Sequence, residues 1–336
     1  MNVAAVVIGR NEAERLRRCL DSCSGVDGMV VYVDSGSTDG SVAIARETSV
    51  DVVELDMSMT FSAARARNAG FARLQALSAA DFIQFVDGDC EIQAEWINRA
   101  SSYMAGHPDV AVLAGRLSER FPDASIYNRL GDLEWNCSKP GEVDAVGGIF
   151  MIRRAAFESV GGFDESVTAG EEPELCQRLI QKGWKLVRLD CDMAWHDLAM
   201  NRFGQWWRRQ MRTGYGGLDV ARRFGLAGFI RNNWRARFWS VWPFLVLMTG
   251  VFAVVSGGAG GIVAAMSVAM LWPLQLGRIA WRSWRNGQPP DIAIAYGYFT
   301  MLSFWPQMFG QIKYALDRFI GRGPCLIEYK SSGVDR

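Results

Sequence analysis

The sequence lacks several patterns that mark common classes of enzyme. It has no G-x-x-x-x-G-K-[ST] segment and no G-x-G-x-x-G segment after its first expected strand, which argues against a P-loop ATPase and a dinucleotide enzyme. Its seven cysteines form no C-x-x-C pair, which argues against a structural zinc site. A phosphate ligand would then need a metal ion to help bind it.

A secretory signal is also missing from the first residues. The segment "MNVAAVVIGRNE" has a short apolar run and no basic leader, so we expect a first strand there. With no paired cysteine pattern, this favours a reducing, cytoplasmic setting. Acidic and basic residues balance at 36 each, and we expect no nucleic-acid partner.

Charged and apolar residues are distributed unevenly along the chain. Residues 1–200 carry about 31 acidic and 19 basic side chains, whereas residues 201–336 carry about 5 and 17. Residues 238–277 contain no charged side chain, and a run of about 40 residues is long enough for two membrane crossings. We expect a membrane hairpin that turns at Ser256–Gly261, "SGGAGG". The alternative is a pair of apolar helices buried in a soluble domain.

A third apolar segment, Ile292–Ile312, contains a proline and two glutamines and is less suited to crossing. If positive flanks stay in the cytoplasm, a hairpin followed by an interfacial or re-entrant third segment keeps every basic cluster on one side. We therefore expect the cell inner membrane, with its anionic lipids as partner and the catalytic domain in the cytoplasm. The basic flanks are Arg222, Arg223, Arg231, Arg235, Arg237, Arg278, Arg282, Arg285, Lys313, Arg318, Arg322 and Lys330.

The first 200 residues alternate strand and helix patterns. The segments "VAAVVIG", "GMVVYVD", "DVVEL" and "FIQFVDGD" are typical of strands, and helical patterns separate them. This predicts an α/β fold with a mostly parallel, Rossmann-like sheet and helices on both faces. Ligands bind such sheets at the carboxyl ends of the strands. We expect a catalytic domain at 1–215, a basic helical segment at 216–237, the hairpin at 238–277, and a basic loop, third segment and tail at 278–336.

Acidic residues end two of these expected strands. Asp34 closes the second strand, and Asp87 and Asp89 follow the strand "FIQFV" on either side of Gly88. Two such aspartates can place carboxylate oxygens on a hard divalent cation, Mg²⁺ or Mn²⁺, that also bridges phosphates. A lone Asp-Gly-Asp is more often only a turn, but the preceding strand and the other acidic clusters favour a site.

A second acidic cluster lies in "GEEPELCQRL". Pro173 suits the first position of a helix, which places Glu172 near the N-cap and ends the helix at Gly183. Glu171 and Glu172 could simply complement the helix dipole, or a carboxylate there could face a cleft as a general base. His196, after a strand, could be a third metal ligand or a structural histidine. The other histidine, His107, precedes Pro108 and is expected in solvent.

The order of these motifs resembles family 2 glycosyltransferases of the inverting GT-A fold. The matching segments are "VVIGRNEAERLRRCL", "VVYVDSGSTDGS", "ARARNAGF", "FVDGDCE", "GGFDES" with "GEEPELCQRL", and "WHD". The resemblance covers about the first 215 residues. The basic, tryptophan-rich segment "RFGQWWRRQMRTGYG" and the apolar tail look like the membrane-attached members that assemble exopolysaccharide or cell-envelope glycans.

The resemblance implies roles for individual residues. Asp34 would hold the nucleotide base and ribose, with Asn11 and Glu12 nearby. Arg67 would face the nucleotide or its phosphates, and Glu172, beside Glu171, would be the catalytic base. Asp87 and Asp89 match the Asp-x-Asp motif that binds metal and nucleotide, and His196 matches a histidine near the diphosphate. Ser35 departs from relatives that have an acidic residue there, and "QWWRRQ" departs from the Q-x-x-R-W motif of processive synthases.

These roles predict an inverting transfer of sugar from a nucleotide-sugar, with UDP-sugar expected from the resemblance, to a hydroxyl of a lipid-linked or other glycan acceptor. The protein could also work within a glycan assembly complex. Two alternatives stay open at this point. One is transfer onto polyprenyl phosphate itself, and the other is a catalytically silent subunit that binds the nucleotide-sugar.

Overall fold

The computed structural model describes residues 2–48, 50–136, 139–225, 227–256, 259–321 and 327. The chain divides into two compact units, Met1–Phe203 and Gly204–Arg336. The expected boundary at residue 215 falls inside helix α8, Phe203–Phe224. Residues 257 and 258 of the expected hairpin turn, and the basic flanks Arg322 and Lys330, lie outside the described residues.

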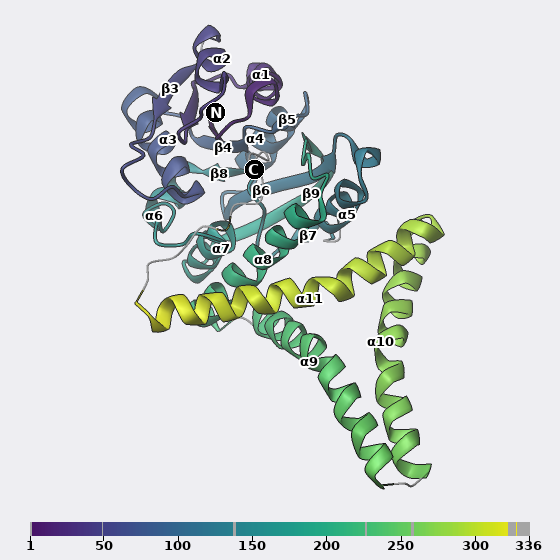
Figure 1. Ribbon diagram of the computed structural model, residues 1–336. Helices are drawn as coiled ribbons and strands as arrows, with labels where there is room; N and C mark the ends of the chain where they lie inside the picture. The colour runs from purple at the N-terminus through teal and green to yellow at the C-terminus, as the bar shows by residue number, and fades with distance from the viewer. Residues whose placement is uncertain are drawn as a thin grey trace. The chain divides into compact units, whose positions relative to one another are not determined.

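Strands and helices alternate through the first unit (Figure 1). The strands are β1 (Val3–Gly9), β2 (Val30–Asp34), β3 (Asp51–Glu54), β4 (Phe82–Asp87), β5 (Cys90–Ile92), β6 (Val110–Glu119), β7 (Gly141–Glu142), β8 (Phe150–Arg153) and β9 (Lys185–His196). The helices are α1 (Ala13–Ser22), α2 (Ser41–Glu47), α3 (Ala63–Leu77), α4 (Trp96–Gly106), α5 (Ile126–Trp135), α6 (Arg154–Ser159) and α7 (Glu171–Gln181).

The strands form one mixed sheet in the order β3-β2-β1-β4-β8-β6-β9-β5, with β7 pairing to β9. The four strands expected from the sequence, β1 to β4, run parallel to one another, which confirms the α/β prediction. Beyond β4 the sheet becomes mixed, because β8 runs antiparallel to β4 and β6 while β6 and β9 are parallel. The long strand β9 carries its last residue, His196, level with the end of β6.

The sheet is buried on both faces at its centre. Residues Val3–Val7 of β1 are at most 1 % exposed, as expected of a parallel strand covered by helices on both sides. Near the carboxyl end of β4 and the start of β8, phenylalanines pack edge to face, with Phe163 5.6 Å from both Phe85 and Phe157 between ring centroids. Phe71 of α3 extends this cluster to Phe157, at 4.6 Å. This aromatic cluster packs beneath one end of the sheet and supports it.

Helix α3 approaches the sheet unusually closely because it has a glycine at the contact. A Cβ added to Gly70 would lie 2.3 Å from Val6 Cγ1 in β1 and 3.0 Å from Val33 Cγ2 in β2. Every other residue type would therefore push the helix outward. The close approach sets the position of Arg67, which lies one turn earlier on the same helix.

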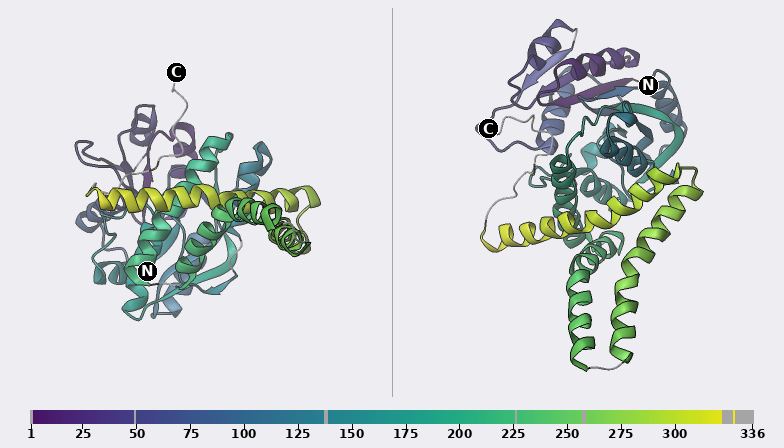
Figure 2. Two further views of the ribbon diagram at one scale, coloured as in Figure 1. Left: turned by 60° about the horizontal axis from the view of Figure 1, so that its bottom comes forward. Right: turned by 45° about the vertical axis from the view of Figure 1, so that its right-hand side comes forward.

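The second unit consists of α8 and three long helices, α9 (Ala227–Ser256), α10 (Ala259–Arg285) and α11 (Pro290–Phe319). The helices α9 and α10 pack as an antiparallel pair (Figure 2). Two stretches within them, Ile230–Val255 and Ala259–Arg285, are long and apolar enough to cross a membrane. They are the two candidates among the described helices, and most of their apolar side chains are exposed.

Helix α11 makes a different kind of contact. It crosses α8 closely through Gly214 and Gly310, where an added Cβ would lie 2.1 Å from backbone oxygen of the other helix. Tyr314 Oη donates to Asp219 at 2.7 Å, and this bond also ties α11 to α8. Such buried polar bonds fix the register of packed helices. The expected interfacial placement of this third segment stays a prediction.

Replacing Gly70 tests the close packing of α3. We expect Gly70→Ala to lower the melting temperature by several degrees, because overpacking a rigid core costs about 1–3 kcal/mol, more than alanine gains in a helix. The matched control is Gly106→Ala at the end of α4, where an added Cβ meets nothing within 4 Å. A Gly70→Ala protein that melts at or above the wild-type temperature would contradict this packing.

Candidate functional site

The carboxyl ends of three parallel strands bring the predicted acidic residues to one edge. In the register of the sheet, Gly9 of β1 lies beside Asp34 of β2, and Ile8 lies beside Asp87 of β4. The two aspartates therefore stand on either side of the end of β1. The adjoining loops carry the other candidates, so the edge is where the sheet rule predicts a ligand.

Asp34 is held rigidly in this edge. Its carboxylate is buried and accepts bonds from Tyr32 Oη at 2.9 Å, Ser37 Oγ at 2.5 Å, and the backbone N–H groups of Gly36 and Ser37. Burial and the neighbouring Asp34 charge raise the pKa of Tyr32 above its usual value, so the phenol stays protonated. Four donors fill the approximately four lone-pair positions of a carboxylate.

Asn11 and Glu12 follow β1 and are hydrogen-bonded to the segment that follows Asp34. Asn11 has a positive φ of 57°, a conformation that asparagine tolerates better than most residues. Its Oδ1 accepts from Thr38 N at 2.7 Å, and its N–H donates to Ser37 Oγ at 2.9 Å. The Glu12 N–H donates to Ser41 Oγ at 3.0 Å. The sequence therefore predicted a group that the structure brings together with Asp34.

Arg67 of α3 lies at the centre of a second group. The residue is 1 % exposed, and its guanidinium contacts Asp87 Oδ1 at 3.0 Å, Glu172 Oε1 at 3.1 Å and Glu171 Oε1 at 3.4 Å. It also stacks over the Phe163 ring, 5.4 Å from the centroid. The sequence assigned Arg67 to the nucleotide or its phosphates, whereas the structure shows it bound to carboxylates. Its role toward a nucleotide stays a prediction.

The two glutamates come from the start of α7. This helix begins at Glu171, with Gly170 at the N-cap in a left-handed conformation, φ 81°. The prediction that Pro173 takes the first helical position was wrong by two residues, whereas Glu172, predicted near the N-cap, is the second residue of the helix. Proline fits here because the N–H groups of the whole first turn have no partner within the helix. The predicted end at Gly183 is confirmed, since Lys182 is the C-cap.

Glu172 has the properties of a general base. Burial, with the negative charges of Glu171 and Asp87, raises the pKa of Glu172 to about 7, while Arg67 acts in the opposite direction. Its side chain is 15 % exposed, against 3 % for Glu171. A carboxylate with this pKa can accept a proton near neutral pH. Glu171 is more deeply buried against Arg67.

Gly148, in the loop before β8, packs directly against this group. A Cβ added to Gly148 would lie 2.6 Å from Asp87 Oδ2, 2.8 Å from Arg67 Nη2 and 3.3 Å from Glu172 Oε1. The Gly148 carbonyl also accepts from Arg67 Nη2 at 3.4 Å. The sequence contains this signal as "GGIF", but the pattern does not tell which glycine touches the carboxylates.

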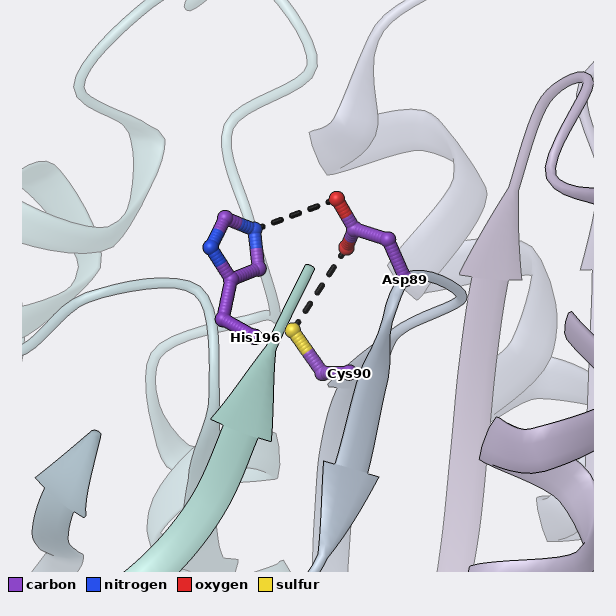
Figure 3. A group of neighbouring side chains, drawn as sticks. All are labelled: Asp89, Cys90 and His196. Carbon is purple, nitrogen blue, oxygen red and sulfur yellow. Dashed lines mark hydrogen bonds and ion pairs between the residues drawn. The ribbon is translucent and has the colours of Figure 1, made fainter. Parts of the chain in front are cut away.

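The second aspartate of Asp-Gly-Asp belongs to a third group. His196 Nε2 lies 3.1 Å from Asp89 Oδ2, and the Cys90 thiol lies 3.5 Å from Asp89 Oδ1 (Figure 3). One ligand atom from each of these three buried residues lies within 4.8 Å of the others, close enough to hold a metal ion. Asp87, predicted as a ligand beside Asp89, is not in this group and faces Arg67. A role for Asp87 at the metal stays a prediction.

Two neighbours of this group were missed by sequence reasoning. Cys90 was considered only for paired cysteine patterns, and it has none. Trp135, at the end of α5, packs edge to face on the His196 ring at 4.5 Å between centroids, and its spacing in the sequence gives no such signal. His107 is exposed at the C-cap of α4, as predicted.

Known proteins share this sequence pattern. The chain is 25% identical over 232 residues to glycosyltransferase AglE of Haloferax volcanii, covering 65% of this chain and 73% of that one. It is 28% identical to a pre-mycofactocin glycosyltransferase of Mycobacterium tuberculosis, covering 58% of this chain but only 43% of that protein. It is also 28% identical to the succinoglycan biosynthesis protein ExoA of Rhizobium meliloti, over 54% and 58% of the two chains.

A solved structure shares the fold. This is the mannosyltransferase PcManGT of Pyrobaculum calidifontis in complex with GDP-Man and Mn²⁺, with a TM-score of 0.58, 18% identity, and coverage of 88% of this chain and 86% of that one. The match confirms the predicted GT-A fold. Family models described as glycosyl transferase family 2 and glycosyl transferase family group 2 match residues 5–161 and 84–281, and the second spans more than half of the chain. The chain is an enzyme that belongs to the family 2 glycosyltransferases.

Proposed function

We propose that the enzyme moves a sugar, with inversion, from a nucleoside-diphosphate sugar to an acceptor hydroxyl. The observation that carries the proposal is Glu172, a partly exposed carboxylate whose pKa is raised to about 7 at the ligand-binding edge of the sheet. The acceptor hydroxyl gives its proton to Glu172 while its oxygen attacks the anomeric carbon. The nucleoside diphosphate leaves from the opposite face, so the configuration inverts.

The donor nucleotide is assigned to the Asp34 group. Asn11 and Glu12 lie beside the base and ribose, and Asp34 accepts a base N–H. Because the Asp34 carboxylate already accepts four bonds, the base N–H replaces one of them. The Ser37 hydroxyl can rotate away, so it is the donor that we expect to be displaced. We propose uracil as the base, from the family resemblance.

The Asp89 group suits a divalent cation. It offers a carboxylate and an imidazole whose Nε2 lies 3.1 Å from that carboxylate. A set with nitrogen and oxygen suits Mn²⁺ better than Mg²⁺, which prefers oxygen alone. Asp89 and His196 would hold the ion, and when bound it would stabilise negative charge on the diphosphate leaving group. The Mn²⁺ in the related mannosyltransferase structure supports this choice.

Nucleotide binding tests the donor site and the metal together. We expect calorimetry on detergent-purified protein to show Mn²⁺-dependent binding of UDP, at least tenfold tighter than GDP or dTDP. Asp89→Asn should abolish the metal dependence, whereas Asp109→Asn, an exposed aspartate paired to Lys185, should not. Tight binding of GDP would overturn only the proposal that the donor base is uracil. If no nucleotide binds, the alternative of a catalytically silent subunit would be favoured.

Glutamate variants test the base. Activity, measured as nucleoside diphosphate release from the donor, should rise with pH through about 7, because Glu172 accepts a proton only when it is ionised. Glu172→Gln should reduce the rate by about 10²–10⁴-fold and leave nucleotide binding intact. Glu158→Gln, at an exposed glutamate of α6, is the control. A Glu172→Gln enzyme that retains the wild-type rate would show that Glu172 is not the catalytic base.

We propose that the hairpin α9–α10 holds the enzyme in the cytoplasmic face of a membrane. Arginines lie at one end of each apolar stretch, the end away from the turn between them. Each basic side chain near an anionic surface contributes about 1 kcal/mol. The arginines are Arg231, Arg235, Arg237, Arg278, Arg282 and Arg285. An enzyme held at the bilayer is well placed for a lipid-linked acceptor, and we propose one in exopolysaccharide or cell-envelope glycan synthesis. The similarity to ExoA supports this setting.

Carbonate extraction of membranes tests the hairpin. Wild-type protein should stay in the pellet, because two apolar crossings do not dissociate at high pH. Met248→Arg with Met266→Arg places a charge in each stretch, at about 2.5–3.5 kcal/mol per residue, and should move much of the protein to the supernatant. Leu77→Arg, an exposed site on α3, is the control. Release of wild-type protein by salt alone would contradict insertion.

A further inference from the structure

The structure places a cysteine at the proposed metal group by a direct strand pairing. The short strand β5 runs antiparallel to the end of β9, and Cys90 lies directly opposite His196 in that register. Paired residues in neighbouring strands have their side chains on the same face of the sheet. Asp89, immediately before Cys90, completes the group shown in Figure 3.

The spacing of the three side chains is close to that of a metal centre. Metal bonds of about 2.0–2.3 Å in a tetrahedral arrangement put the ligand atoms roughly 3.3–3.8 Å apart. Cys90 Sγ lies 3.5 Å from Asp89 Oδ1, and His196 Nε2 lies 3.1 Å from Asp89 Oδ2. All three residues are buried, with Cys90 at 0 %, Asp89 at 2 % and His196 at 8 % exposure. One ligand atom of each of the three lies within 4.8 Å of the others.

We propose that Cys90 is a third protein ligand of the metal in this enzyme, through Sγ. The inference rests on the proposed metal role of Asp89 and His196 and adds sulfur to their donor set. On binding, the Cys90 thiol loses its proton to the buffer, and the thiolate forms the bond to the ion. Three protein ligands leave a position for an oxygen of the donor diphosphate, the arrangement of open metal sites in enzymes.

Sulfur changes which ions the site prefers. Thiolate favours Zn²⁺, Co²⁺ and Cd²⁺, whereas Mg²⁺ prefers oxygen ligands. We expect Co²⁺ to bind at least tenfold more tightly to wild-type protein than to Cys90→Ser, whereas the affinity for Mg²⁺ should change less than about threefold. Thiophilic ions should therefore displace Mn²⁺ as well as Mg²⁺ from the full-length enzyme.

Cobalt titration tests this directly, because a sulfur ligand gives a charge-transfer band in the near ultraviolet that nitrogen and oxygen ligands do not. Purified full-length protein should show this band on addition of Co²⁺ alone. Cys90→Ser should lose it and keep the weaker visible bands of cobalt bound by Asp89 and His196. Cys191→Ser is the matched control, because this thiol is more exposed and lies elsewhere on β9, and it should keep the band.

The outcomes separate this inference from the proposed function. Cobalt bound with visible bands but without the sulfur band in wild-type protein would overturn the role of Cys90 and leave Asp89 and His196 as ligands. No cobalt binding at all would overturn both. If Cys90→Ser fails to fold, X-ray absorption of cobalt on wild-type protein decides the question: a sulfur at about 2.3 Å supports the inference, and a shell of only nitrogen and oxygen overturns it.

Discussion

The buried guanidinium of Arg67 is the interaction on which the catalytic edge depends. A charge removed from water is costly unless it is paired and hydrogen-bonded, and here one guanidinium contacts carboxylates from β4 and from the start of α7. Burial alone would lower the pKa of Arg67, but its three acidic partners raise it above the usual value. The side chain therefore stays charged and ties α3, β4 and α7 together.

The same interaction sets the chemistry of Glu172. Three acidic side chains share one cation, so the group carries excess negative charge, and a proton on one carboxylate relieves it. Glu172 is the carboxylate that takes up this proton most readily, because its pKa is raised to about 7 even though Arg67 opposes the shift. Glu171, less exposed on the same turn, holds the guanidinium from the other side. Removing Arg67 would raise the Glu172 pKa further and leave the base protonated at neutral pH.

Much of this arrangement was predictable, for reasons that are local. Strands β1, β2 and β4 are mostly apolar. Asp34 and Asp87 are the last residues of β2 and β4, and Asn11 follows the end of β1 by two residues, so their position at one edge follows from parallel pairing. The antiparallel strands β5 and β8 were missed because they have three and four residues, too short for a period to show. The contacts of Gly148 and Cys90 depend on loops and cross-strand register, which a single sequence does not encode in its spacing.

The turn after the buried strand β4 sends the side chains of Asp87 and Asp89 to two different groups of residues. Gly88 donates its N–H to Ile8 O at 2.8 Å, and an added Cβ would lie 3.2 Å from that oxygen and 3.3 Å from Glu12 Cγ. The turn is therefore pressed against the end of β1. On one side of it Asp87 faces Arg67, and on the other Asp89 directly precedes β5 and faces His196. A single glycine thus separates the carboxylate that belongs to the Arg67 group from the one that belongs to the metal group, and the two groups are held a fixed distance apart by the sheet.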